Sequence, residues 1–118
     1  MHELGIVFYI IRDVKKVAEE NGVRHVSAVV MNIGEVSTVV PAYLTDCWRW
    51  AADKEEVLKG CELRVNKLPA VTWCDDCHSE YRTIKHGKTC PSCGSGNTWL
   101  LRGNEVEIKE IVVDDETN

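Results

Sequence analysis

Four of the six cysteines form two Cys-x-x-Cys pairs in the second half of the chain. The pairs are Cys74 with Cys77 and Cys90 with Cys93, and twelve residues separate them. A tight turn lets both thiols of such a pair reach one ion, and four thiolates at about 2.3 Å complete the tetrahedral shell of Zn²⁺. The spacing therefore predicts a structural zinc site with no open position for water or substrate.

Other chemistries fit parts of this cysteine pattern. Iron in a rubredoxin-like site uses the same sulfur geometry, and two disulfides would fit an oxidising compartment. The stretch from Cys74 to His78 also satisfies the C-x-x-C-H pattern of covalent haem attachment. We favour zinc over disulfides because the amino terminus lacks the features of a secretory signal and cytosolic thiols stay reduced. We favour it over haem because haem would leave the second pair without a role.

The chain opens with a second set of metal donors, in the sequence MHE. Met1 offers an α-amine, His2 an imidazole and Glu3 a carboxylate, with backbone amides between them. An α-amine titrates at about 7.7–8.0 and an imidazole at about 6.5, so both can be deprotonated near neutral pH. These residues also fit a simpler interpretation, a polar helix start in which Glu3 faces the positive end of the helix dipole.

Hydrophobic periodicity predicts the elements that must position these donors. Apolar residues recur at three- and four-residue steps over about residues 3–20, which predicts an amphipathic helix that ends at Asn21–Gly22. A run rich in β-branched residues predicts a strand over about residues 24–33. Pro41 suits a first helical turn, and the apolar spacing after it predicts a second helix.

Two further stretches alternate between apolar and polar residues, which predicts strands. One covers residues 61–68, and the other is the segment NEVEIKEIVV at 104–113. The cysteine-rich stretch between them has few aliphatic residues and needs a metal to stabilise it. We interpret Cys47 and Cys61 as buried and inert, because they lie on the apolar faces of their elements.

The order of these elements predicts an α+β fold in which two helices pack on one face of a three-stranded sheet, with an inserted zinc-ribbon-like domain that carries the four cysteines. The predicted domains are residues 1–69 with 104–118, which carry the amino-terminal donors, and residues 70–103, which carry the cysteine pairs. Linkers are expected near Leu68–Pro69 and 102–104. These linkers would permit two chains to exchange their inserted domains, so a homodimer is a possible oligomeric state.

Composition narrows the function classes. With 118 residues, of which 44% are hydrophobic and 28% charged, the chain resembles soluble globular proteins, and no apolar run is long enough to span a membrane. The formal net charge of −5 argues against a general nucleic-acid binder. We expect a cytoplasmic protein that is not an enzyme and binds neither membranes nor nucleic acid. A zinc-ribbon module for nucleic acid or transcription is the alternative.

Several motifs follow one another along the whole chain in a characteristic order. They are MHEL, Ile33-Gly34-Glu35, Lys59-Gly60-Cys61, the two cysteine pairs and the final strand GNEVEIKEI. In this combination the chain resembles the HypA/HybF family of accessory proteins for nickel insertion into [NiFe]-hydrogenases. The resemblance implies a nickel metallochaperone without catalysis of its own. It implies a nickel site at Met1, His2 and Glu3, built chiefly from amine, imidazole and backbone amide nitrogen, beside a separate structural zinc.

The resemblance also implies two partners, a HypB-type GTPase accessory protein and the hydrogenase large-subunit precursor. We expect the first helix, including Lys15 and Lys16, to contact the GTPase because it lies next to the nickel donors. The chain departs from several family members in the loop after Ile33-Gly34-Glu35. That loop reads Ser-Thr-Val-Val at residues 37–40, with Val40 in place of a carboxylate, so no loop acid can be a nickel ligand here.

Overall fold

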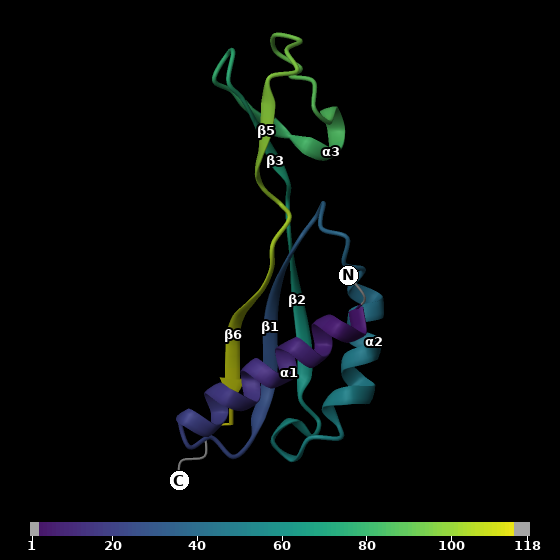
Figure 1. Ribbon diagram of the computed structural model, residues 1–118, viewed down its shortest axis with the longest axis vertical. Coiled ribbons are helices and arrows are strands. Elements are labelled where there is room, and N and C mark those ends of the chain that lie inside the picture. The colour runs from purple at the N-terminus through teal and green to yellow at the C-terminus, as the bar shows by residue number, and fades with distance from the viewer. Residues whose placement is uncertain (1–2, 115–118) are drawn as a thin grey trace. The chain divides into compact units, whose positions relative to one another are not determined.

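The computed structural model describes residues 3–114, which form two compact units. The first, called the helical unit, contains the described parts of Met1–Asn32, Val39–Asn66 and Glu107–Asn118. The second, called the cysteine unit, contains Ile33–Thr38 and Lys67–Val106. Figure 1 shows the chain with most of its helices and strands labelled. The predicted α+β class is confirmed.

Two helices belong to the helical unit, α1 (Glu3–Glu20) and α2 (Pro41–Ala52). The apolar stripe of α1 is buried and consists of Ile6, Val7, Ile10, Ile11, Val14 and Ala18. The helix ends as predicted, because the Asn21 side chain donates to the Val17 carbonyl at 2.8 Å and Gly22 adopts a φ of +66°. No helix within residues 3–114 has the length and apolar character needed to cross a bilayer.

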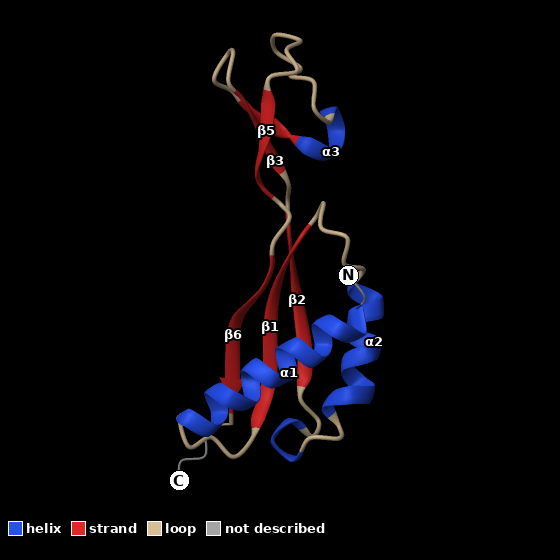
Figure 2. Cartoon of the chain, viewed as in Figure 1, coloured by secondary structure: helices blue, strands red, loops and turns tan. Residues whose placement is uncertain are grey.

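The sheet of the helical unit has the strand order β2-β1-β6, with bounds Val26–Gly34 for β1, Glu62–Leu68 for β2 and Val106–Val113 for β6. The central strand β1 is almost wholly buried, as its run of β-branched residues predicts. Figure 2 shows α1 lying across one face of this sheet. The α2 helix packs against α1, and the 3₁₀ turn η1 (Glu56–Leu58) follows it.

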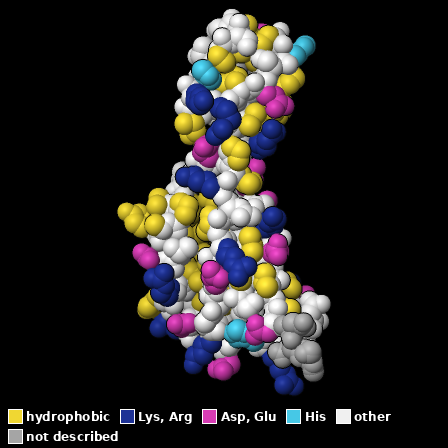
Figure 3. Space-filling view, turned by 180° about the vertical axis from the view of Figure 1, so that it is seen from behind, with side chains coloured by type: hydrophobic (Ala, Val, Ile, Leu, Met, Phe, Trp, Pro, Cys, Tyr) yellow, Lys and Arg dark blue, Asp and Glu magenta, His cyan; other side chains and the backbone are white. Residues whose placement is uncertain are grey.

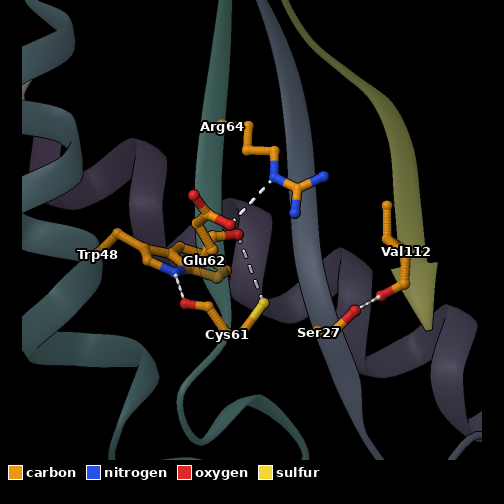
Figure 4. A network of polar contacts seen from close by, with 6 residues as sticks. All are labelled: Ser27, Trp48, Cys61, Glu62, Arg64 and Val112. Carbon is orange, nitrogen blue, oxygen red and sulfur yellow. Dashed lines mark hydrogen bonds and ion pairs between the residues drawn. The ribbon is translucent and has the colours of Figure 1, made fainter. Parts of the chain in front are cut away.

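A polar contact joins α2 to the start of β2. The Trp48 indole donates from Nε1 to the Cys61 carbonyl at 2.8 Å, and Figure 4 shows the indole turned toward that strand. Cys61 is buried, and burial, with a smaller contribution from the Glu62 charge, raises the pKa of its thiol to about 11. The predicted burial of Cys61 is confirmed, and its raised pKa favours the protonated thiol, whereas Cys47, also predicted to be buried, is only half-buried.

The cysteine unit contains a second sheet, in the order β4-β3-β5, which the sequence did not predict. Its elements are β3 (Val71–Cys74), β4 (Glu80–Arg82), the short helix α3 (Thr83–His86) and β5 (Thr98–Arg102). Both strand pairs are antiparallel, and Trp73 lies opposite Trp99. The strands are too short for periodicity to distinguish them from loops.

The end of β1 and the turn after it bind both chain segments that enter and leave the cysteine unit. The Glu35 N–H donates to the Leu68 carbonyl at 2.8 Å, and the Val36 N–H donates to the Gly103 carbonyl at 2.8 Å. The Glu35 carboxylate accepts the Ala70 N–H at 2.7 Å, and this bond is the main cause that lowers the pKa of Glu35. The motif Ile33-Gly34-Glu35 therefore has a structural role at the base of the unit.

Candidate metal centre

The four predicted cysteine ligands converge at the end of the cysteine unit, with all four Sγ atoms within 4.8 Å of one another. The Sγ atoms of Cys74 and Cys93 are 3.6 Å apart, and those of Cys77 and Cys90 are 3.5 Å apart. Sulfur atoms around a tetrahedral zinc with Zn–S bonds of about 2.3 Å lie about 3.8 Å apart. The geometry therefore fits one tetrahedrally coordinated metal ion.

Each cysteine pair is held by the same local turn. The His78 N–H donates to the Cys74 carbonyl at 2.9 Å, and the Gly94 N–H donates to the Cys90 carbonyl at 2.8 Å. His78 and Gly94 occupy equivalent places after their pairs, and both have positive φ values, of 57° and 75°. His78 therefore completes a turn of the kind that glycine completes in the other pair, and its ring stacks on Trp73 at 5.8 Å between centroids.

The electrostatics of the cluster favour a bound cation. Burial opposes ionisation of Cys90, but hydrogen bonds from the backbone of Cys93 and Ser92 outweigh it and lower the pKa of Cys90 to about 6. A hydrogen bond from the Ser95 backbone favours the Cys93 thiolate, but burial and the neighbouring thiols raise the pKa of Cys93 to about 12. Four thiolates so close together need a positive charge among them, which a divalent metal would supply.

Two aspartates between the first pair of cysteines support the cluster, and sequence reasoning did not identify this role. The Asp75 carboxylate accepts both indole N–H groups, from Trp73 at 2.9 Å and from Trp99 at 3.2 Å. The Asp76 carboxylate accepts from the Ser95 hydroxyl and from Asn97 Nδ2, and these bonds lower the pKa of Asp76. Asp76 thus connects the two cysteine turns. The position of Asp76, a short acidic residue inside a Cys-x-x-Cys turn, is the sequence signal that could have indicated this connecting role.

Only one of the three predicted nickel donors lies within the described residues, since Met1 and His2 fall outside them. Glu3 is the first residue of α1, and its carboxylate accepts the backbone N–H of Val40 at 3.1 Å. Val40 directly precedes α2 as its N-cap residue. The first turn of α1 therefore lies against the start of α2, within the helical unit.

The remaining histidines that the structure describes have other surroundings. His25 contacts the Asp114 carboxylate through Nδ1 at 2.6 Å and the Lys59 carbonyl through Nε2 at 2.7 Å, so both ring nitrogens have partners. His86 packs edge-on against Tyr81, at 5.8 Å between ring centroids. Among residues 3–114, the four cysteines are the only group of three or more His, Cys, Asp and Glu side chains arranged to hold a metal.

A known protein family matches the chain over nearly its whole length. The family model described as hydrogenase/urease nickel incorporation, metallochaperone, hypA matches residues 1–113 of the chain. The chain belongs to the HypA family. This HypA chain is 32% identical to the hydrogenase maturation factor HypA of Geotalea uraniireducens, over 97% of this chain and 100% of the relative. It is 30% identical to the hydrogenase maturation factor HybF of Klebsiella pneumoniae, over 94% of this chain and 97% of the relative.

Solved HypA structures share the fold of this HypA chain. A solution structure of the Ni metallochaperone HypA from Helicobacter pylori superposes with a TM-score of 0.71 at 23% identity, covering 96% of this chain and 97% of the other. A second HypA solution structure superposes with a TM-score of 0.74 at 24% identity, covering 98% of each. The resemblance to HypA and HybF, inferred from the order of the motifs, is therefore confirmed. The family is one of nickel-incorporation metallochaperones for hydrogenase maturation.

Proposed function

We propose that this HypA family member binds Ni(II) at its amino terminus and delivers it to a [NiFe]-hydrogenase large-subunit precursor. Nickel is the cargo, and the resident ion is a structural zinc held by Cys74, Cys77, Cys90 and Cys93. The observation that carries the proposal is the family match over residues 1–113, which includes both the MHE sequence and the four cysteines. The protein itself catalyses no reaction.

The donor chemistry of the amino terminus suits this cargo. The α-amine of Met1, the His2 imidazole and the backbone amides of His2 and Glu3 would close small chelate rings, and tetragonal nitrogen donors suit Ni(II). The amine, the amides and the imidazole must lose protons to bind, so acidification should weaken the site. A site at a chain end can also be approached by a partner, whereas the four-cysteine cluster leaves no position for exchange.

A nickel titration of zinc-loaded protein tests the proposal. The wild-type chain with its native terminus should bind one nickel ion. His2→Ala removes the imidazole, and one residue added before Met1 displaces the α-amine. We expect each change to weaken nickel binding by at least about 100-fold, because each removes a direct donor and the loss of an outer-shell group alone costs up to about 100-fold. Competition with a chromophoric chelator measures the affinity.

Two controls make the nickel titration decisive. Zinc content must stay at one ion per chain in all three proteins, so that a change in nickel binding reflects the amino terminus alone. Equal nickel affinity in the three proteins would show that the terminal site is wrong. His78, His86 and Cys47 would then be the next donors to replace.

The proposed contact surface for the HypB-type GTPase partner is a groove along α1, with a volume of about 590 Å³. It is lined by Phe8, Ile11, Arg12, Lys15, Lys16, Ala18, Glu19, Val23 and Val57. Phe8 is 51% exposed although it is a large apolar side chain. Three cations and one anion line the groove in a chain whose net charge is −5. This charge pattern suits an acidic, amphipathic segment of the partner.

Reversing the charge of the groove should weaken binding of the GTPase. For Lys15→Glu/Lys16→Glu we expect at least about a tenfold loss of affinity at low salt, and a smaller loss at high salt, where charges are screened. Lys15 also pairs with Glu55 at 2.7 Å, an exposed ion pair worth at most about 1 kcal/mol, so the variant should stay folded. Calorimetric titration with the partner at two salt concentrations gives the measurement.

The matched control for the groove is Lys85→Glu/Lys88→Glu, which makes the same charge change at exposed positions of the cysteine unit. Its affinity for the GTPase should stay at the wild-type value. Equal effects of the two double variants would mean that net charge alone matters, and the groove would lose its assigned role.

The charge distribution of the cysteine unit supports the nickel proposal over a nucleic-acid-binding zinc ribbon. Arg82 pairs with Glu35 at 3.3 Å, and Arg102 pairs with Glu80 at 3.5 Å, so carboxylates neutralise both arginines. On the face drawn in Figure 3, Lys and Arg side chains are interspersed with Asp and Glu side chains rather than gathered in a stripe. A phosphate backbone is bound by clustered cations.

A further inference from the structure

The amino-terminal end of α2 lacks a cap from its own sequence. Its N-cap residue is Val40, with φ −98° and ψ 111°, and no side chain of this residue can accept a hydrogen bond from the helix. In a capping box, a Glu or Gln three residues into the helix accepts the N–H of the N-cap residue. That position is Tyr43 in α2, which has no carboxylate. The Val40 N–H must therefore find an acceptor elsewhere.

Glu3 supplies this acceptor from a different helix. Its Oε2 lies 3.1 Å from the Val40 nitrogen, so the first residue of α1 fills the place that a capping-box glutamate would fill in α2. The positive end of the α2 dipole also favours a carboxylate at this point. Val40 itself is held in place, because its carbonyl accepts the Leu44 N–H at 3.0 Å. The contact thus links Glu3, at the start of α1, to the N-cap residue of α2.

This contact uses the backbone N–H of Val40, so it forms although the loop carries no carboxylate at position 40. Chain ends fray unless something holds them. Glu3 lies two residues after Met1, and its backbone amide is one of the proposed nickel donors. Because its carboxylate accepts the Val40 N–H, Glu3 has a tertiary contact at the start of α1, next to the proposed nickel donors.

We propose that Glu3 is a positioning residue of the nickel site, acting through its hydrogen bond with the Val40 N–H and not as a carboxylate ligand. This inference rests on the proposed amino-terminal nickel site. In this proposal, residue 40 contributes through its backbone N–H, which donates a hydrogen bond to Glu3, and not through its side chain. It also implies that the acceptor oxygen at position 3 matters more than the negative charge, which the positive end of the helix dipole favours only weakly.

Three substitutions separate these properties. Glu3→Gln keeps an acceptor oxygen and removes the charge. Glu3→Ala removes both. Val40→Pro removes the N–H and leaves Glu3 untouched; the ψ of 111° at this position suits proline, and its φ must change from −98° toward about −65°. Glu20→Ala is the matched control, because it removes an exposed carboxylate from the last turn of the same helix.

The experiment is a nickel titration of the zinc-loaded full chain, with absorption spectra of the bound ion. We expect Glu3→Gln and Glu20→Ala to bind nickel within about threefold of the wild type, and Glu3→Ala and Val40→Pro to bind about tenfold more weakly. The double variant Glu3→Ala/Val40→Pro should be no weaker than either single variant, because both remove the same bond. The d–d bands should keep their wild-type energies in all of them, since the donor atoms stay the same.

The outcomes distinguish this inference from the function on which it rests. Wild-type affinity in His2→Ala overturns the terminal nickel site itself. Loss of binding in His2→Ala together with wild-type affinity in Glu3→Ala keeps the site and overturns the positioning role. If Glu3→Gln is as weak as Glu3→Ala and shifts the d–d bands, the carboxylate is a ligand and the inference is wrong.

Discussion

Replacing Cys90 and Cys93 together by serine should release the zinc and unfold the cysteine unit, while the helical unit keeps its structure. A small buried cluster of the cysteine unit consists of Cys74, Tyr81 and Cys90. Two of these three residues are proposed metal ligands, so little apolar core is left around the metal site without the ion. The other buried apolar side chains described in this unit are Ile33, Ala70 and Val71. Structural zinc contributes about 10–16 kcal/mol of apparent binding free energy in zinc-finger peptides, which exceeds what such a cluster can supply.

Metal analysis and amide NMR spectra of the double variant give the measurement. We expect zinc to fall from one ion per chain to none, with loss of dispersed signals from residues 67–106. Cys47→Ser is the matched control, because this half-buried thiol lies outside the cluster. It should keep its zinc. A double variant that loses zinc and still keeps full stability would mean that the metal has no structural role.

The parts of the fold that sequence predicted best are those whose signal is local. The apolar period of α1 covers eighteen residues, and the observed bounds Glu3–Glu20 agree with the prediction. The four cysteines are also local in pattern, since each pair forms its own turn, and their sulfur atoms converge as the spacing indicates. Local signals of this kind do not depend on how the rest of the chain packs.

The contacts that sequence did not predict join residues far apart in the chain. Nothing near Glu3 indicates that its carboxylate accepts the Val40 N–H, because the two residues belong to different helices. The strands β3, β4 and β5 are short and depend on pairing with one another. Asp76 likewise acts through Ser95 and Asn97, on the other cysteine turn. Such contacts follow from tertiary packing.

Gly34 is the clearest example of such a distant contact, and Gly34→Ala should strongly destabilise the cysteine unit. A Cβ at this position would lie 2.0 Å from the Gly103 carbonyl oxygen and 2.5 Å from the Asn104 nitrogen. Both obstacles are backbone atoms, so no side-chain rotation can relieve the clash. The two segments would have to separate, which would break the bond from Gly34 N–H to the Glu105 carbonyl, at 2.7 Å. We expect a loss of about 3 kcal/mol.

Urea unfolding of zinc-loaded protein, followed by tryptophan fluorescence, measures this loss. Gly96→Ala is the matched control in the same unit, because a Cβ there meets no heavy atom within 4 Å. The control should change stability by no more than about 0.5 kcal/mol. Gly34→Ala should keep its zinc in the absence of urea, since the four cysteines lie at the other end of β3, and this separates its effect from that of cysteine loss. Equal midpoints for the two alanine variants would refute the close approach of Gly34 and Gly103. A large difference would show that Gly34 in the Ile33-Gly34-Glu35 motif is required for backbone packing rather than for metal binding.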